Sequence, residues 1–230
     1  MQLILSKISH PNSEIRNPKL VKNIIFDFGG VLCDLDIKRT EEKFKEFGTP
    51  VPDKTSSPLE QAFEFEQLVG HFETGAISSK DFRVIIKNYY QVPPSDQAID
   101  EAWNALLLDI PEPRIRLLEQ IRGYYRIFML TNTNEIHHLK YLENFRAQYG
   151  YSDFDSLFEK AYFSYRIGLK KPDIEIFSYV LNNSHLIPSE TLFIDDTLIH
   201  VETAQSMGIQ AHHLQIQAGE QIMDLFSGFR

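Results

Sequence analysis

Beyond Pro111 the chain alternates between two patterns of apolar and polar residues. Short apolar runs are typical of buried strands, and longer segments with apolar residues every three or four positions are typical of amphipathic helices. Strands are predicted at residues 125–130, 160–164, 191–195 and 210–214, and helices at 112–123, 134–145, 173–184 and 197–208. This alternation predicts a doubly wound α/β core, in which right-handed crossovers build a parallel sheet covered by helices on both faces.

The first half of the chain follows a different pattern. The run VKNIIF at 21–26 predicts one more buried strand, which leads into a turn at Asp27-Phe28-Gly29-Gly30. Because this strand has no neighbouring strand in the sequence, we assign it to the same sheet. Four amphipathic helices follow, separated by Gly and Pro residues, and they are predicted at residues 38–47, 58–72, 78–90 and 94–108.

These elements predict how the chain is divided. We expect an N-terminal extension at 1–20, an α/β core formed by 21–37 and 110–230, and an inserted helical cap domain at 38–109. The expected fold class is therefore α/β, with a doubly wound, Rossmann-like parallel sheet and an inserted α-helical cap domain. The core and the cap each fall within the usual size range of domains.

Composition narrows the class of partner and the compartment. There are 32 Asp and Glu residues against 23 Lys and Arg, a formal net charge of -9, which argues against binding to the phosphate backbone of nucleic acid. The single cysteine, Cys33, excludes an intramolecular disulfide and a Cys-clustered metal site, and it fits a reducing compartment. No apolar run approaches the ~18 residues of a membrane-spanning helix, so we expect a cytoplasmic protein without a membrane partner.

Polar residues at the ends of the predicted strands are candidates for chemistry, because the carboxyl ends of parallel strands border the ligand crevice. A carboxylate can act as a nucleophile or metal ligand, a hydroxyl beside backbone amides can hold an oxyanion, and a lysine can neutralise phosphate. Magnesium prefers oxygen ligands from carboxylates, phosphate and water. The candidate positions are Asp27, Thr131 with Asn132, Lys171 in the LKKP segment, and Asp195 with Asp196.

Each of these positions also has a purely structural interpretation. Asp27 and the glycines after it are compatible with a simple turn, Thr131 with a helix N-cap, and Lys171 with a solvated loop. The adjacent carboxylates of Asp195 and Asp196 are harder to explain, because at a buried strand end they repel each other unless a cation or hydrogen bonds offset the repulsion. The coincidence of all these positions favours a shared site.

Four segments together resemble a known family. IIFDFGGVL, MLTNTN, GLKKPD and LFIDD, the last followed by a helix with Ala204 and Gly208, resemble the four motifs of the haloacid dehalogenase superfamily. The long interval between the first two motifs suits a member with a helical cap of the C1 type. TNTN with His137 three residues later, and the segment HFETGAISSKDF, resemble the branch of bacterial sugar-phosphate phosphatases similar to glucose-1-phosphate phosphatase.

The resemblance implies a magnesium-dependent phosphatase that acts on a small phosphorylated metabolite, with sugar phosphates favoured. It makes Asp27 the nucleophile that forms an aspartyl phosphate, with Thr131 and Lys171 as the other catalytic residues. Magnesium would be held by Asp27, the backbone carbonyl of Gly29, Asp196 and, directly or through water, Asp195. The residues implied to bind the phosphoryl group are Gly29, Gly30, Thr131, Asn132 and Lys171.

One position departs from the family pattern. Most phosphatases of the superfamily carry a second Asp, the general acid and base, two residues after the nucleophile, where this chain has Gly29. The resembling sugar-phosphate branch also has Gly there. Either the substrate has a good leaving group, or another residue acts as the general acid and base. The candidates for such a group are Asp34, His137, His200 and Glu73, and the candidates for the substrate pocket are Phe65, Phe72, Glu73 and His137.

Two other functions stay open at this point. A hydrolytic 2-haloacid dehalogenase also uses an Asp nucleophile, but it needs no metal, and the pair Asp195-Asp196 argues against it. A catalytically silent, phosphate-binding regulatory module is the second alternative, and Gly29 motivates it. The substrate and the oligomeric state are not determined by the sequence.

Overall fold

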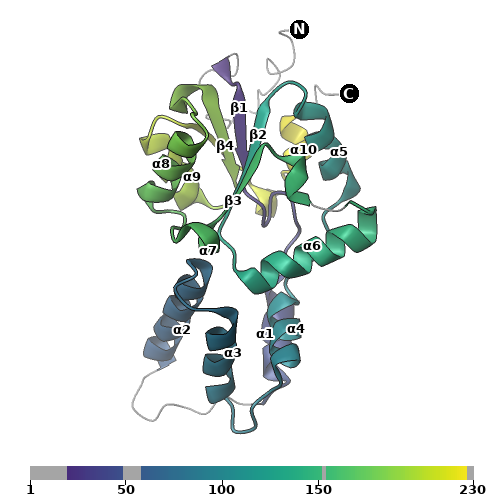
Figure 1. Ribbon diagram of the computed structural model, residues 1–230, viewed down its shortest axis with the longest axis vertical. Coiled ribbons are helices and arrows are strands. Elements are labelled where there is room, and N and C mark those ends of the chain that lie inside the picture. Colours follow the sequence, from purple (N-terminus) through teal and green to yellow (C-terminus); the bar gives the residue numbers. More distant parts are fainter. Residues whose placement is uncertain (1–19, 49–57, 152–153, 227–230) are drawn as a thin grey trace.

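The computed structural model describes residues 20–48, 58–151 and 154–226 (Figure 1). The predicted extension at 1–20 lies outside the described residues except for Leu20. Among the described residues, none of the helices has the length and apolar character that crossing a membrane requires.

A five-stranded, entirely parallel sheet forms the centre of the α/β part, with the strand order β3-β2-β1-β4-β5. The strands are β1 (Asn23–Phe26), β2 (Arg126–Thr131), β3 (Lys160–Phe163), β4 (Thr191–Asp195) and β5 (Gln210–His213). All five strands predicted from the sequence are confirmed, including the assignment of the isolated first strand, β1, to this sheet. Phe26 at the end of β1 lies opposite Met129 of β2 and Ile194 of β4, so the three central strands end at the same edge.

Helices cover both faces of the sheet, as the doubly wound pattern predicts (Figure 1). Ile24 and Phe26 of β1 point into a core shared with one set of helices, and Ile25 between them points into a second core on the opposite face. This alternation is the period-two geometry of a strand that is buried on both sides. The helices are α5 (Glu112–Ile121), α6 (Glu135–Tyr149) and α10 (Ile222–Leu225) against the first core, and α8 (Ile174–Asn183) and α9 (Leu198–Ser206) against the second.

Four further helices lie beyond the carboxyl ends of the strands (Figure 1). They are α1 (Ile37–Lys45), α2 (Pro58–Glu73), α3 (Ser79–Asn88) and α4 (Asp96–Asn104). Their buried side chains form a third apolar cluster, and Ile136 of α6 joins it. The hydroxyl groups of Ser78 and Ser95 cap α3 and α4, which explains why these helices begin where they do. The inserted helices predicted from the sequence are therefore confirmed, while the exact domain boundaries stay a prediction.

The predicted helix at 94–108 ends early, at Asn104. The residues after it pair with the segment that leads into α1: Leu35 and Leu107 form an antiparallel bridge, and the amide of Asp36 donates to the carbonyl of Leu106 at 2.9 Å. The two connecting segments that join the inserted helices to the sheet therefore run side by side. A short helix, α7 (Ser164–Ile167), follows β3 directly and was not predicted from the sequence.

Candidate active site

Residues from four separate segments meet at the carboxyl edge of the sheet. Asp27 follows β1, Thr131 ends β2, Asp195 ends β4, and Lys171 comes from the loop before α8. The Lys171 ammonium lies 2.8 Å from Oδ1 of Asp27 and 2.6 Å from Oδ2 of Asp195. The structure thus brings together the side chains that the sequence singled out across more than half the chain.

Lys171 is buried, with 2% of its surface exposed, so it is not a solvated loop lysine. The side chain of Asn132 fixes its backbone: the Asn132 amide donates to the Lys171 carbonyl at 2.8 Å and accepts from the Lys171 amide at 2.9 Å. Burial disfavours the charged ammonium, but the carboxylates of Asp195 and Asp27 outweigh it and raise the pKa of Lys171. Lys171 is therefore a permanent positive charge beneath the site.

The alternative that Thr131 is a helix N-cap is wrong, because the side chain of Asn134 caps α6 by accepting from the His137 amide at 3.1 Å. Thr131 is buried at the end of β2, with its hydroxyl 3.4 Å from the carbonyl of Asn132. The Thr131 hydroxyl therefore lies at the end of β2 and does not cap α6.

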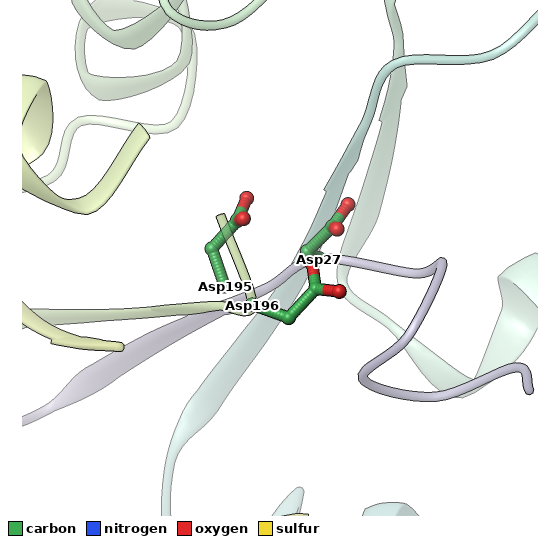
Figure 2. Close-up of side chains that lie close together, drawn as sticks. All are labelled: Asp27, Asp195 and Asp196. Atoms are coloured by element: carbon green, nitrogen blue, oxygen red, sulfur yellow. The ribbon is translucent and has the colours of Figure 1, made fainter. Parts of the chain in front are cut away.

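Three carboxylates share this edge. One oxygen from each of Asp27, Asp195 and Asp196 lies within 4.8 Å of the others (Figure 2). Burial raises the pKa of Asp27 to about 7, an effect that Lys171 opposes and the other two carboxylates reinforce, and burial with Asp195 also raises the pKa of Asp196. Three carboxylates around one ammonium leave an excess of negative charge, and the donors are oxygens, so the cluster fits a divalent cation such as Mg²⁺.

The two adjacent aspartates have different surroundings. Asp195 is fully buried, and its oxygens accept from the Thr197 amide at 2.8 Å, from Lys171, and from His200, whose Nδ1 lies 3.1 Å away. Burial acts to raise the pKa of Asp195, but Lys171 and His200 outweigh it and hold the pKa below its usual range. Asp196, by contrast, lines the cavity above the site together with Asp27.

The two glycines after Asp27 are required by close approach. Gly30 has a φ of 76°, and a Cβ at this position would lie 2.3 Å from Oδ2 of Asp196. At Gly29 a Cβ would lie 2.7 Å from the terminal methyl group Cδ1 of Leu35. A side chain at position 29 would therefore require the side chain of Leu35 to move.

A cavity of about 870 Å³ lies between the strand ends and the inserted helices. Asp27, Thr131, Lys171 and Asp196 form its floor, along with Gly29 and Asn132. Most of its other lining residues are apolar or aromatic, namely Phe28, Leu35, Ile37, Phe44, Phe65, Val69, Ile86, Tyr89, Tyr90, Trp103, Leu106, Leu107 and Tyr141. The polar ones are Thr40, Glu41, Glu73, Thr133, His137, Thr197 and His200.

The four pocket candidates from the sequence fall into two groups. Phe65, Glu73 and His137 line the cavity. Phe72 does not line it within the described part of the chain: its ring is buried among the inserted helices and stacks on Phe82 with centroids 4.3 Å apart. Both phenylalanines lie on α2, seven residues apart. Contact with Phe82 of α3 buries Phe72 among the helices, while Phe65 is left to line the cavity.

The four candidates for the missing general acid and base also separate. Asp34 pairs with Arg114 at 2.8 Å and lies outside the cavity lining of the described residues. His137 stacks on Trp103 and contacts Asn104 at 3.0 Å, and burial lowers its pKa to about 3, so its ring is neutral. These two candidates are unsuited to donate a proton to a substrate in the cavity at neutral pH.

The other two candidates, His200 and Glu73, line the cavity. His200 is tied to Asp195. The Glu73 carboxylate, at the end of α2, lies 3.4 Å from the ammonium of Lys170. Burial raises the pKa of Glu73, and Lys170 opposes this rise. The pair Glu73–Lys170 joins the inserted helices to the loop that carries Lys171, and Lys170 was missed in the sequence, where only its position beside Lys171 pointed to it.

Comparisons with known proteins agree with this geometry. The family described as haloacid dehalogenase-like hydrolase matches residues 21–208. A D-ribitol-5-phosphate phosphatase from Bacteroides thetaiotaomicron is 27% identical over 195 residues, which cover 83% of this chain and 90% of that protein. The sesquiterpene phosphatase astK from Aspergillus oryzae is 29% identical over 197 residues, which cover 84% of this chain and 89% of that one.

Solved structures of a HAD family enzyme also resemble this chain. The HAD family enzyme bt-2542 from Bacteroides thetaiotaomicron superposes with a TM-score of 0.80 at 34% identity, covering 90% of this chain and 98% of that one. The same enzyme in complex with magnesium and inorganic phosphate gives a TM-score of 0.78 at 36% identity, covering 90% of this chain and 99% of that one.

Proposed function

The chain belongs to the haloacid dehalogenase-like hydrolase family, and from this we propose that it is a magnesium-dependent phosphatase with Asp27 as its nucleophile. The curated relatives described above are phosphatases, and the chain is a phosphomonoester hydrolase of the same family. The observation that carries the proposed mechanism is the cluster of Asp27, Lys171 and Asp196 on the floor of the cavity. It combines a nucleophile, a fixed positive charge and oxygen ligands for a cation.

Asp27 and Asp196 are the side chains proposed to hold the metal, together with the carbonyl oxygen of Gly29. Both carboxylates face the cavity, whereas Asp195 is occupied by Lys171, His200 and the Thr197 amide. We therefore assign Asp195 the role of orienting Lys171 rather than that of a direct ligand. When bound, Mg²⁺ supplies charge neutralisation for the phosphoryl oxygens and for Asp27.

The reaction proceeds in two displacements. A carboxylate oxygen of Asp27 attacks phosphorus, the bond from phosphorus to the ester oxygen breaks, and the departing alcohol takes up a proton. Water then attacks the phosphorus of the aspartyl phosphate and gives a proton to the group that protonated the alcohol, while the bond from phosphorus to the Asp27 oxygen breaks. This releases inorganic phosphate and restores the Asp27 carboxylate. Lys171, the Thr131 hydroxyl and the backbone N–H of Asn132 hold the phosphoryl oxygens in line, and such positioning supplies most of the catalysis in phosphoryl transfer.

Glu73 is the residue we assign as the proton donor for the departing alcohol. It lines the cavity with Asp27, and burial raises its pKa, which favours the protonated form that an acid needs. The end of α2, where Glu73 lies, packs closely against the α/β core. Gly75, with a φ of 68°, allows this approach, because a Cβ at position 75 would lie 2.2 Å from the backbone carbonyl oxygen of Tyr165. The inserted helices would thus supply the group that Gly29 lacks.

The alternative functions are less well supported. A dehalogenase has no use for a cluster of three carboxylates around one lysine, and this cluster is the main feature of the site. A silent binding module is compatible with Gly29, but Glu73 provides a carboxyl group in the cavity. The preference for sugar phosphates comes from the sequence resemblance alone, and the two curated relatives are named for substrates with very different alcohol parts, a pentitol and a sesquiterpene.

The proposal is tested by a phosphate-release screen over alkyl, aryl and sugar phosphates with Mg²⁺ and with EDTA. We expect activity that depends on Mg²⁺ and is lost in Asp27→Asn, while Asp109→Asn, an exposed aspartate outside the cavity lining of the described residues, retains it. Mass spectrometry of the native protein, quenched during turnover, should show a phosphoryl group on Asp27. Full activity of Asp27→Asn, or activity that survives EDTA, would contradict the proposal.

A further inference from the structure

We propose that the natural substrate is a phosphomonoester whose alcohol part is a hydrocarbon or an aromatic group rather than a sugar. This inference rests on the proposed phosphatase function and narrows its substrate class. The evidence is the contrast between the charged floor of the cavity and its apolar walls.

The walls expose large apolar side chains to the cavity. Ile37 of α1 is 65% exposed, Leu35 before it is 39% exposed, and Phe65 of α2 is 38% exposed, and all three line the cavity. Trp103 of α4 and Val69 of α2 extend the same surface. Apolar surface left open to water is stabilised when an apolar ligand covers it, and pockets lined in this way select apolar ligands.

Three polar groups on the apolar part of the walls are directed into the protein, whereas the charged or titratable wall residues Glu41, Glu73 and His200 also line the cavity. The Thr40 hydroxyl donates to the carbonyl of Trp103 at 3.3 Å, and the Tyr90 hydroxyl donates to the carbonyl of Phe44 at 3.3 Å. The indole N–H of Trp103 donates to the side chain of Asn134 at 3.3 Å. The hydroxyl groups of a sugar would lose their hydrogen bonds to water here, with those three wall groups already engaged.

The apolar surface begins directly beside the reacting group. Leu35 covers Gly29, two residues from Asp27, and a Cβ on Gly29 would touch its methyl group Cδ1 at 2.7 Å. Asp27, Gly29 and Leu35 all line the cavity, so the apolar wall starts within two residues of the proposed nucleophile along the chain.

The test compares unbranched alkyl phosphates from ethyl to octyl, with hexyl phosphate set against sorbitol 6-phosphate. The longer alkyl phosphates share nearly the same leaving group, so chain length changes mainly the buried apolar area. We expect kcat/KM to rise about fourfold per methylene, the free energy of one buried CH₂ expressed as a ratio, and hexyl phosphate to exceed sorbitol 6-phosphate. A flat series, or a preference for sorbitol 6-phosphate, would overturn the inference.

Two wall variants locate the effect. Ile37→Ser and Phe65→Ser change exposed side chains, so both proteins should fold, and each should lower kcat/KM for octyl phosphate about tenfold while leaving ethyl phosphate nearly unchanged. Val92→Ser is the matched control, because Val92 is 80% exposed and lies outside the cavity lining of the described residues. Equal effects of the three substitutions on octyl phosphate would contradict the assignment of the walls.

Binding to Asp27→Asn separates this inference from the phosphatase proposal. Calorimetric titration with ethyl and octyl phosphate in the presence of Mg²⁺ measures the apolar contribution without turnover. If the native protein releases no phosphate from any ester but Asp27→Asn binds octyl phosphate more tightly than ethyl phosphate, the phosphatase proposal fails and the apolar cavity stands. If phosphate is released but chain length changes neither binding nor kcat/KM, the inference about the substrate fails and the phosphatase proposal stands.

Discussion

The floor and the walls of the cavity are built in opposite ways. On the floor, the carboxylates of Asp27 and Asp196 lie beside Lys171, and the ammonium of Lys171 contacts both Asp27 and the buried Asp195 beneath. On the walls, apolar side chains from four helices and their connections face the open space. The charged groups are held by hydrogen bonds across the sheet, whereas the apolar groups are held by packing among helices.

This difference assigns separate tasks to the two regions. The rigid sheet fixes the geometry of phosphoryl transfer, which tolerates little displacement. The inserted helices form the surface that meets the rest of the substrate, and they place two acidic residues on the cavity, Glu41 and Glu73, the second of them beside Lys170. Changes on the floor should therefore reduce activity on every phosphate ester, and changes in the walls should alter which esters are hydrolysed.

The largest effect is expected for Lys171→Met, which keeps the aliphatic stem but removes the charge between Asp27 and Asp195. Loss of one preorganised charge that stabilises the transition state should lower kcat/KM about 10³-fold for every phosphate ester. Steady-state kinetics with hexyl and 4-nitrophenyl phosphate measure it, with near-UV circular dichroism to check folding. Lys170→Met is the control and should reduce kcat/KM less than tenfold. Equal losses in the two variants would contradict the assignment of Lys171.

Glu73→Gln tests the one charged contribution of the helices to the chemistry. We expect kcat for hexyl phosphate to fall about 10²-fold, because its alcohol must be protonated as it leaves, while 4-nitrophenyl phosphate, whose leaving group needs no proton, changes little. Both esters need the ionised Asp27, but only hexyl phosphate needs the protonated Glu73, so in the native protein the ratio of kcat for hexyl phosphate to kcat for 4-nitrophenyl phosphate should fall as pH rises through the pKa of Glu73.

The Gln variant should lack this fall in the ratio of the two kcat values with rising pH. Glu66→Gln is the matched control, since Glu66 is exposed on the same helix. Equal losses with both esters would show that Glu73 has a structural role instead.

A smaller effect is expected from Gly30→Ala, which tests the position of Asp196 on the floor. The added Cβ would meet Oδ2 of Asp196, so the carboxylate must move, and a displacement of this size should cost about tenfold in kcat/KM and weaken activation by Mg²⁺. Gly168→Ala is the matched control: Gly168 also has a positive φ, of 80°, but a Cβ there has no atom of the described structure within 4 Å. The same Mg²⁺ activation constant in both variants would contradict the proposed role of Asp196.

The smallest effect concerns stability at the junction of walls and floor. His137 is neutral when folded, with a pKa of about 3, and recovers its ordinary pKa near 6.5 when unfolded. Below pH 6.5 the unfolded chain therefore binds a proton that the folded protein does not, and the free energy of unfolding falls as pH drops toward 3. Between pH 7 and pH 5 this group should account for about 2 kcal/mol of lost stability.

His137→Leu should lose less stability than the native protein over the same pH interval. Urea unfolding at the two pH values measures this loss. An unchanged loss in the variant would mean that the ring is not held neutral.

The sequence by itself determined the α/β architecture and the positions of the floor residues. Strand and helix periodicities are local signals, and a residue such as Asp27 or Asp195 that directly follows a buried strand must emerge at the carboxyl edge of the sheet. The resemblance of the four motifs then identified the family before any contact was known.

Only the tertiary structure decided which partner each candidate meets. Phe65 and Phe72 belong to the same apolar pattern of one helix, yet Phe65 faces the cavity and Phe72 packs on Phe82. The pairing of Glu73 with Lys170, and the position of Leu35 over Gly29, join segments that are separate in the chain. Periodicity places a side chain on a face of its helix, but what that face meets depends on the packing of distant elements. This packing places both Glu73, the proposed proton donor, and the apolar walls.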